Sequence, residues 1–224
     1  MEAHTNRKKV NNLIIIDQSG SMSIIRRSTL EGINETIKTC QALEEQYPEV
    51  EQYITMVTFN SGEYKVLCEN AKAFDVAPLT IEQYIPGGGT PLYDAIGRAV
   101  SMTDAHVEKG DNVLVTVLTD GEENCSREFN LKMVKNLIEK RTADGWTFSL
   151  IGTDNLDVET MAQELSIENR FEFKQCDEDT DCMWATERKS RMIYTCAVAK
   201  SKELERGAYF KVTSKNSTQE RNNK

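Results

Sequence analysis

The side chains best suited to chemistry follow an apolar run near the start of the chain. Four consecutive branched aliphatic residues, 13–16, are followed by Asp17, Ser19 and Ser21 at alternate positions. An Asp at the carboxyl end of a buried strand lies at the edge where open α/β sheets bind ligands. Alternating residues can point their oxygens to one side, and these hard ligands suit Mg²⁺, Mn²⁺ or Ca²⁺. A strand end followed by a turn and a helix N-cap explains this window equally well, because Ser and Asp are common in both.

Two later loops offer further oxygen ligands. The loop 87–91 contains three glycines before Thr90, and glycine allows the unusual dihedrals that bring a backbone close to a neighbouring loop. Asp120 follows a second apolar run at 112–118, so it too is an acid at the end of a buried strand.

The expected topology brings these loops together. Loops that follow successive parallel strands converge on one edge of a doubly wound sheet. Asp17 and Asp120 should therefore meet there, together with Ser19, Ser21 and Thr90. Two carboxylates without a basic partner repel each other and raise each other's pKa, and a divalent cation removes that repulsion. The combination predicts a metal site built from these five side chains.

Strand and helix patterns alternate along almost the whole chain. We expect strands at 13–16, 52–59, 64–69, 112–118, 146–151 and 170–173. We expect helices at 24–47, 92–107, 127–144, 158–165 and 177–205, and a short helical turn at 79–84. The turn at 60–63 makes one hairpin. The sequence therefore predicts an α/β fold: a doubly wound, mostly parallel six-stranded sheet with one antiparallel edge strand and helices on both faces. We expect a single domain over 8–205, with flexible termini at 1–7 and 214–224.

The composition argues against two classes of partner, nucleic acids and membranes. The 224 residues carry 27 Lys and Arg against 36 Asp and Glu, a formal net charge of −9. The one compact basic run is 7–9, which argues against nucleic acid as a partner, because phosphate contacts need clustered cations. The sequence shows no apolar leader and no stretch long enough to cross a bilayer, so we expect a cytoplasmic protein without a membrane partner.

The cysteines and histidines point away from soft-metal and histidine-based chemistry. The six cysteines are scattered without CxxC spacing, so we expect reduced thiols and no structural zinc. They are Cys40, Cys68, Cys125, Cys176, Cys182 and Cys196. The chain has two histidines, and neither lies in a catalytic motif.

The order Asp-x-Ser-x-Ser, a distal Thr and a distal Asp resembles the metal-ion-dependent adhesion site (MIDAS) of the von Willebrand factor type A (vWA) family. Asp17, Ser19, Ser21, Thr90 and Asp120 match all five ligand positions. The stretches Gly88-Gly89-Thr90-Pro91-Leu92 and Thr119-Asp120-Gly121 look like the bacterial and intracellular branch of the family. The resemblance runs from about 11 to 173 in element order, is weak in the terminal helix, and implies the Rossmann-like vWA fold.

The resemblance implies binding rather than turnover. In the family, the hydroxyls ligate the cation directly, the acids act partly through water, and an Asp or Glu carboxylate of a partner protein completes the shell. We therefore expect a non-enzymatic, metal-dependent adaptor or subunit of an intracellular assembly, with Mg²⁺ as the cation and Mn²⁺ or Ca²⁺ as alternatives. Glu122 and Glu123 would lie around the rim, where a solvated surface is favoured over a role in partner choice.

Other interpretations stay open to different degrees. The chain could hold the vWA fold yet work through a surface without metal. A metal-dependent, phosphatase-like hydrolase with Asp17 as nucleophile is disfavoured, because haloacid dehalogenase-like enzymes carry an acid where this chain has Ser19. No Gly-Lys-Ser/Thr follows the glycines of 87–89, and no GxGxxG follows the first strand, which disfavours nucleotide sites. The sequence identifies neither the partner nor the oligomeric state.

Overall fold

A six-stranded sheet forms the centre of the computed structural model, which describes residues 7–202 and 207–211. The strands are β1 (Lys8–Asp17), β2 (Val50–Phe59), β3 (Tyr64–Lys72), β4 (Asn112–Thr119), β5 (Thr147–Thr153) and β6 (Asn169–Phe173). Their spatial order is β3-β2-β1-β4-β5-β6, and every neighbouring pair is parallel except β2 and β3. The predicted fold class, with one antiparallel edge strand, is confirmed.

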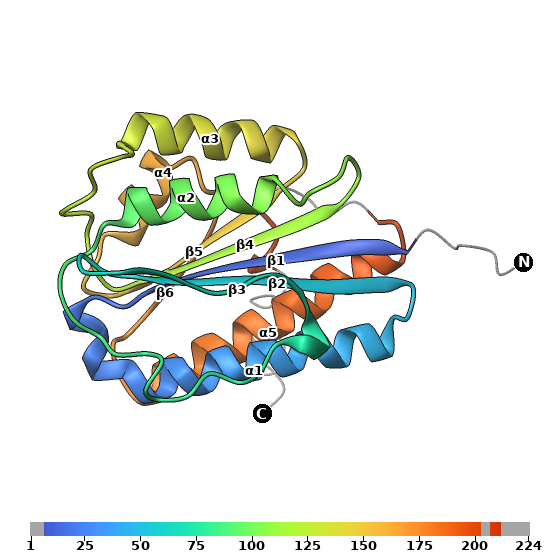
Figure 1. Cartoon of the computed structure of the whole chain (residues 1–224), viewed down its shortest axis with the longest axis horizontal. Helices are drawn as coiled ribbons and strands as arrows, with labels where there is room; N and C mark the ends of the chain where they lie inside the picture. The colour runs from blue at the N-terminus through green and yellow to red at the C-terminus, as the bar shows by residue number, and fades with distance from the viewer. Residues whose placement is uncertain (1–6, 203–206, 212–224) are drawn as a thin grey trace, which may run out of the picture.

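Helices cover both faces of this sheet (Figure 1). They are α1 (Arg26–Gln46), α2 (Leu92–Asp104), α3 (Leu131–Ala143), α4 (Val158–Glu164) and α5 (Asp177–Ala199), with 3₁₀ turns η1 (Gly20–Ile25) and η2 (Ala73–Asp75). α1 and α5 pack on one face and α2, α3 and α4 on the other. The sheet has a hydrophobic core on each face, one under α1 and α5 and the other under α2, α3 and α4. The aliphatic run of β1 is continuous because Ile14 and Ile16 enter the former core while Leu13 and Ile15 enter the latter.

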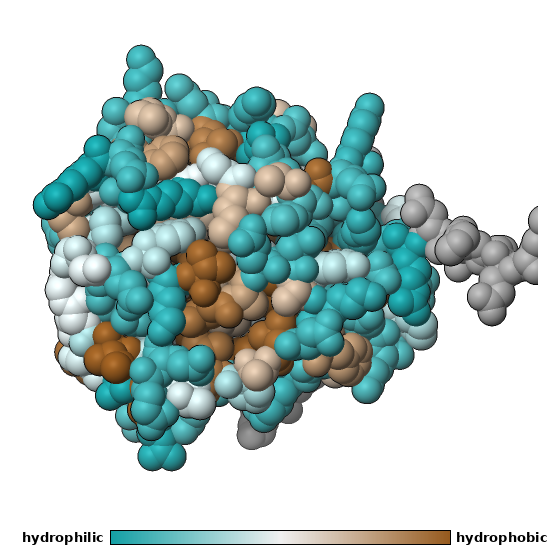
Figure 2. All heavy atoms as spheres, viewed as in Figure 1, coloured by the Kyte–Doolittle hydropathy of each residue, from teal (hydrophilic) through white to brown (hydrophobic). Residues whose placement is uncertain are grey.

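The sheet is exposed to solvent along the edge formed by β3. The side chains of β3 are only partly buried or exposed, whereas the second half of β2 beside it is fully buried. Figure 2, viewed in the same direction as Figure 1, shows apolar residues reaching the surface in the middle of this view of the molecule. None of the helices in the described part of the chain is both long and apolar enough to cross a bilayer.

Several helical predictions have wrong boundaries. The helix predicted from 24 is preceded by η1 and becomes α-helical at Arg26. The helix predicted at 127–144 begins only at Leu131, because Asp94 accepts hydrogen bonds of 2.8 to 2.9 Å from the backbone N–H groups of residues 127–129 and holds them outside the helix. The helix predicted at 92–107 ends at Asp104.

The short helical turn predicted at 79–84 is present as a hydrogen-bonded turn, in which the Gln83 N–H donates to the Thr80 carbonyl at 3.0 Å. The side chain of Asn34 accepts from the Leu79 N–H at 2.7 Å and donates to its carbonyl at 3.0 Å, so α1 holds the start of this segment in place. The last helix, predicted to reach 205, ends at Ala199. Residues 203–206, like the ends 1–6 and 212–224 on which the predicted flexible termini mostly fall, lie outside the described residues.

Two features fix α5 against the sheet and α1. A Cβ on Gly32 of α1 would lie 2.2 Å from the Trp184 ring, so the absence of a side chain lets these helices approach closely. On the same helix, Arg191 and Glu187 form an ion pair whose side chains are 1% and 0% exposed, and Arg191 also donates to Asn12 of β1. These contacts fix α5, and the loop that precedes it reaches the candidate site described below.

Candidate metal centre

The candidate site lies where β1 and β4 end side by side. Asp17 is the last residue of β1, Thr119 is the last of β4, and the two strands pair in parallel up to Ile16 and Leu118. Thr119 Oγ1 donates to Asp17 Oδ2 at 2.6 Å, and the Ser19 N–H donates to Asp17 Oδ1 at 2.6 Å. Both carboxylate oxygens of Asp17 are therefore held by neighbouring groups.

The two serines bring the β1 loop to Asp120. Ser21 Oγ donates to Asp120 Oδ1 at 2.7 Å, and Ser19 Oγ lies 3.4 Å from the same oxygen. The two hydroxyl oxygens are 3.2 Å apart. Residues as far apart in the sequence as Asp17 and Asp120 thus form one cluster of two acids and their hydroxyl donors, as the convergence of the strand ends predicts.

Thr90 reaches the cluster through its glycine loop. The Gly20 N–H donates to the Gly88 carbonyl at 3.0 Å, and Gly88 has φ 76°, a backbone conformation that suits glycine. A Cβ on Gly121 would lie 2.5 Å from Thr90 Oγ1, so the hydroxyl of Thr90 lies directly against the backbone beside Asp120. The structure therefore brings all five predicted ligands to one edge of the sheet.

The two acids are buried without a cationic partner. Asp17 is 0% exposed and Asp120 is 4% exposed. Burial raises the pKa of Asp17 to about 6, an effect opposed by the hydrogen bonds from Thr119 and Ser19 and increased by the charge of Asp120. Burial also raises the pKa of Asp120. None of the ion pairs among the described residues includes either acid.

This donor set fits a hard divalent cation. Carboxylate and hydroxyl oxygens are the ligand types that suit Mg²⁺, Mn²⁺ and Ca²⁺. A cation would also offset the repulsion and burial that disfavour the ionised acids. Within the described ranges, no group of three or more His, Cys, Asp or Glu side chains could share a metal ion, so a cation here would depend on the hydroxyls as well.

Sequence reasoning missed two residues at this site. Gln175, in the loop between β6 and α5, donates from Nε2 to Asp120 Oδ2 at 2.5 Å and to the Ser21 carbonyl at 3.2 Å. Tyr84 donates its hydroxyl to the Asp17 carbonyl at 2.8 Å. The loop of Gln175 also follows a parallel strand, so the rule that such loops converge could have singled it out.

Glu123 corrects another expectation. Its carboxylate accepts hydrogen bonds from the backbone of Cys125 and Ser126, from the Ser126 hydroxyl and from the Tyr93 N–H, all at 2.6 to 2.9 Å. It therefore ties the β4–α3 loop to the first turn of α2, whose N–H groups lack helical partners. Glu122 is exposed, as expected.

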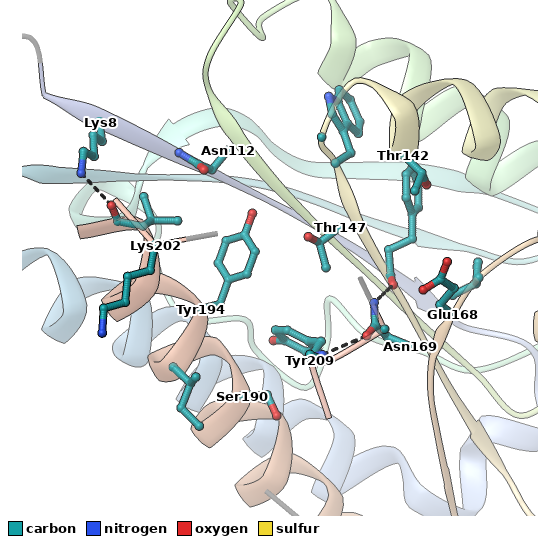
Figure 3. Close-up of a pocket in the computed structure, with 18 of the residues that line it drawn as sticks. Lys8, Asn112, Thr142, Thr147, Glu168, Asn169, Ser190, Tyr194, Lys202 and Tyr209 are labelled. Atoms are coloured by element: carbon teal, nitrogen blue, oxygen red, sulfur yellow. Dashed lines mark hydrogen bonds between the residues drawn. The ribbon is translucent and has the colours of Figure 1, made fainter. Parts of the chain in front are cut away.

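A cavity of about 790 Å³ lies at the opposite end of the strands (Figure 3). It is lined by the first residues of β4, β5 and β6, namely Asn112, Thr147 and Asn169, and by Ser190 and Tyr194 of α5. None of the five predicted ligands lines it. It is therefore separate from the candidate metal centre.

The comparisons with known proteins establish the fold. No protein-family model matches this chain. The magnesium-chelatase 67 kDa subunit of Heliobacterium mobile is 26% identical over 113 residues, which cover 50% of this chain and 16% of that subunit. The pilus adhesin SpaC of Lactobacillus rhamnosus GG superposes with a TM-score of 0.64 at 14% identity, over 84% of this chain and 31% of SpaC.

A further structural relative carries the domain name itself. The vWF domain of the type V pili tip protein Mfa5 of Porphyromonas gingivalis has a TM-score of 0.59 at 12% identity, over 80% of this chain and 95% of that domain. The fold of this chain is thus that of vWA domains. The chain spans less than a third of SpaC and about a sixth of the chelatase subunit. Likeness at this level of identity establishes the fold, and metal binding stays a prediction.

Proposed function

We propose that this chain is a metal-dependent protein-binding module. Asp17, Ser19, Ser21, Thr90 and Asp120 would hold a divalent cation, with Mg²⁺ as the expected ion. The observation that carries the proposal is the meeting of two buried, uncompensated acids with three hydroxyl side chains at one edge of the sheet.

The ligand types favour the capture of an acidic partner. When bound, the cation would supply a Lewis-acidic centre for an Asp or Glu carboxylate of a partner protein. Hydroxyls neutralise less of its charge than carboxylates would, which preserves its attraction for an incoming anion. The chain's own residues position this donor set: Thr119 and the Ser19 N–H hold Asp17, and the contact between Gly20 and Gly88 holds the Thr90 loop.

We propose binding rather than catalysis. The hydroxyl of Ser21 donates to Asp120, and Ser19 occupies the position where a phosphatase-like enzyme would need a second acid. The partly matching relative is by name a subunit of magnesium chelatase, which supports a role as an adaptor or subunit. We further propose a cytoplasmic location, supported by six cysteines that are all unpaired.

Metal binding is tested by thermal unfolding with Mg²⁺ or Mn²⁺ against EDTA. Excess metal should raise the Tm of the wild type, because a ligand that binds only the folded state stabilises it. Asp17→Ala should abolish the shift. Glu122→Ala is the matched control: it also removes one acid near the site, but an exposed one, and should keep the shift. A wild-type protein whose Tm is unchanged by either metal would contradict the proposal.

Partner capture is tested by affinity purification of the tagged chain in Mg²⁺ and in EDTA. We expect proteins that are retained by the wild type in Mg²⁺, released by EDTA and not retained by Thr90→Ala. Changing the contacting Asp or Glu of such a protein to Asn or Gln should release it as well. Retention that is equal in EDTA and in the Thr90→Ala variant would instead favour the alternative, a vWA-fold domain with a non-metal surface.

A further inference from the structure

Gln175 connects the loops that carry the candidate ligands. Its amide nitrogen uses both hydrogens, one toward Asp120 Oδ2 and one toward the Ser21 carbonyl. Asp120 belongs to the loop after β4 and Ser21 to the loop after β1, while Gln175 itself lies between β6 and α5. One neutral side chain thus joins three loops at the site.

A fourth loop fixes the orientation of this amide. Asn155, after β5, donates from Nδ2 to Gln175 Oε1 at 2.5 Å, and the Gln175 N–H donates to Asp154 Oδ1 at 3.1 Å. Because the oxygen of Gln175 is used by Asn155, its nitrogen is the atom that faces Asp120. The contact is therefore a donor to a carboxylate, and a glutamate at 175 could not make it.

We propose that Gln175 is a positioning residue of the metal centre and limits the negative charge there. It occupies Asp120 Oδ2, so that Oδ1, which already faces Ser21 and Ser19, is the oxygen available to a cation. Partners that orient ligating carboxylates in this way commonly matter to metal affinity. The inference rests on the proposed function, because it assumes the cation site at Asp17 and Asp120.

The neutral amide also has an electrostatic consequence. A glutamate of nearly the same shape would place a third carboxylate at the site, against Asp120. Such a carboxylate would attract a cation more strongly, but it would repel Asp120 in the metal-free protein. A residue that only ties loops together has no reason to respond to charge in this way. Ala and Glu at position 175 should therefore have different effects.

The test measures free Mn²⁺ by its electron paramagnetic resonance signal during titration of the full chain. Gln175→Ala should weaken Mn²⁺ binding by about 10- to 100-fold. Gln175→Glu should bind Mn²⁺ at least about tenfold more tightly than Gln175→Ala, as expected for an added charge at the site. In EDTA, Gln175→Glu should have a lower Tm than Gln175→Ala. Gln46→Glu, an exposed change at the end of α1, is the control for added charge and should bind Mn²⁺ as the wild type does.

The outcomes separate this inference from the proposed function. If the wild type binds Mn²⁺ and Asp17→Ala does not, the metal site stands. Unchanged Mn²⁺ affinity in Gln175→Ala would then overturn the role of Gln175 alone. Equally weak binding by the Ala and Glu variants would reduce Gln175 to a structural tie and would also overturn it. A wild type that binds no Mn²⁺ would overturn both proposals.

Discussion

The change Gly121→Ala tests whether Thr90 belongs to the site. A Cβ at position 121 would lie 2.5 Å from Thr90 Oγ1 and 3.4 Å from Thr90 Cβ. Carbon and oxygen do not approach to 2.5 Å without a bond, so the hydroxyl must move. Thr90 is only 2% exposed, and its backbone N–H is held by Asn124 Oδ1 at 2.9 Å, so the backbone has little freedom to retreat. Rotation of the side chain would take the hydroxyl away from Asp120.

The cost follows from overpacking. Inserting a methyl group into a well-packed region typically costs about 1–3 kcal/mol. For a chain of this size, 1 kcal/mol corresponds to roughly 2–4 °C in Tm. The metal-free Gly121→Ala protein should therefore melt about 2–12 °C below the wild type. Its stabilisation by Mg²⁺ should also shrink, because one of the five predicted ligands is displaced.

A double-mutant cycle with Thr90→Ala isolates the contact. Removing Oγ1 leaves Thr90 Cβ as the nearer contact, at an ordinary 3.4 Å, so the added methyl group is tolerated. In EDTA, the cost of Gly121→Ala should thus fall in the Thr90→Ala background, with a coupling of about 0.5–3 kcal/mol. Urea unfolding of the four proteins measures it. Additive costs would show that Thr90 Oγ1 does not lie against residue 121. The assignment of Thr90 as the fifth ligand would then be refuted.

Two further predictions concern buried charge. The pKa of Asp17 is raised to about 6 by burial, so its protonation stabilises the folded, metal-free chain at low pH, and this stabilisation is lost as the pH rises through 6. Between about pH 5 and about pH 7.5 in EDTA, the free energy of unfolding of the wild type, measured in urea, should fall by about 1–2 kcal/mol more than that of Asp17→Asn. An equal pH dependence of the two proteins would contradict this. Arg191→Met leaves Glu187 buried without its cationic partner and should lower the free energy of unfolding by about 3–5 kcal/mol. Adding Glu187→Leu should restore much of this stability. A double variant no more stable than Arg191→Met would refute this account.

Much of the fold and the core of the candidate site could be predicted from local patterns. A run of four aliphatic residues marks a strand buried on both faces, and an acid after it marks the ligand-binding edge of the sheet. Parallel strand order then places Asp17 beside Asp120, because β1 and β4 are neighbours. Each of these steps depends on residues close in sequence or on a general rule of topology.

The rest depends on contacts that local patterns do not encode. The start of α3 is displaced because Asp94, on α2, binds the backbone of residues 127–129. Glu123 is drawn out of solvent by the Tyr93 N–H of α2 and by the backbone of its own loop. Gln175 reaches Asp120 only because β6 and α5 are placed correctly, which in turn depends on the close packing of α5 on α1. In each case a side chain satisfies the backbone or carboxylate of a distant segment, and its residue type alone is compatible with a solvated surface.

The net charge of the chain sharpens what the proposed cation must do. At −9, the chain repels an acidic partner overall, and Glu122 and Asp154 are exposed on loops at the same edge as the site. At physiological salt, charges are screened beyond about 8 Å, so the repulsion and any compensating attraction act within the contact itself. Without metal, that contact presents two buried acids to an incoming carboxylate, and burial only strengthens the repulsion. The cation would therefore have to supply the local attraction, and the neutral Gln175 matters because a third acid would offset part of it. A partner that binds through a carboxylate should accordingly depend on the metal for recognition itself, beyond any gain in stability that the metal gives the fold.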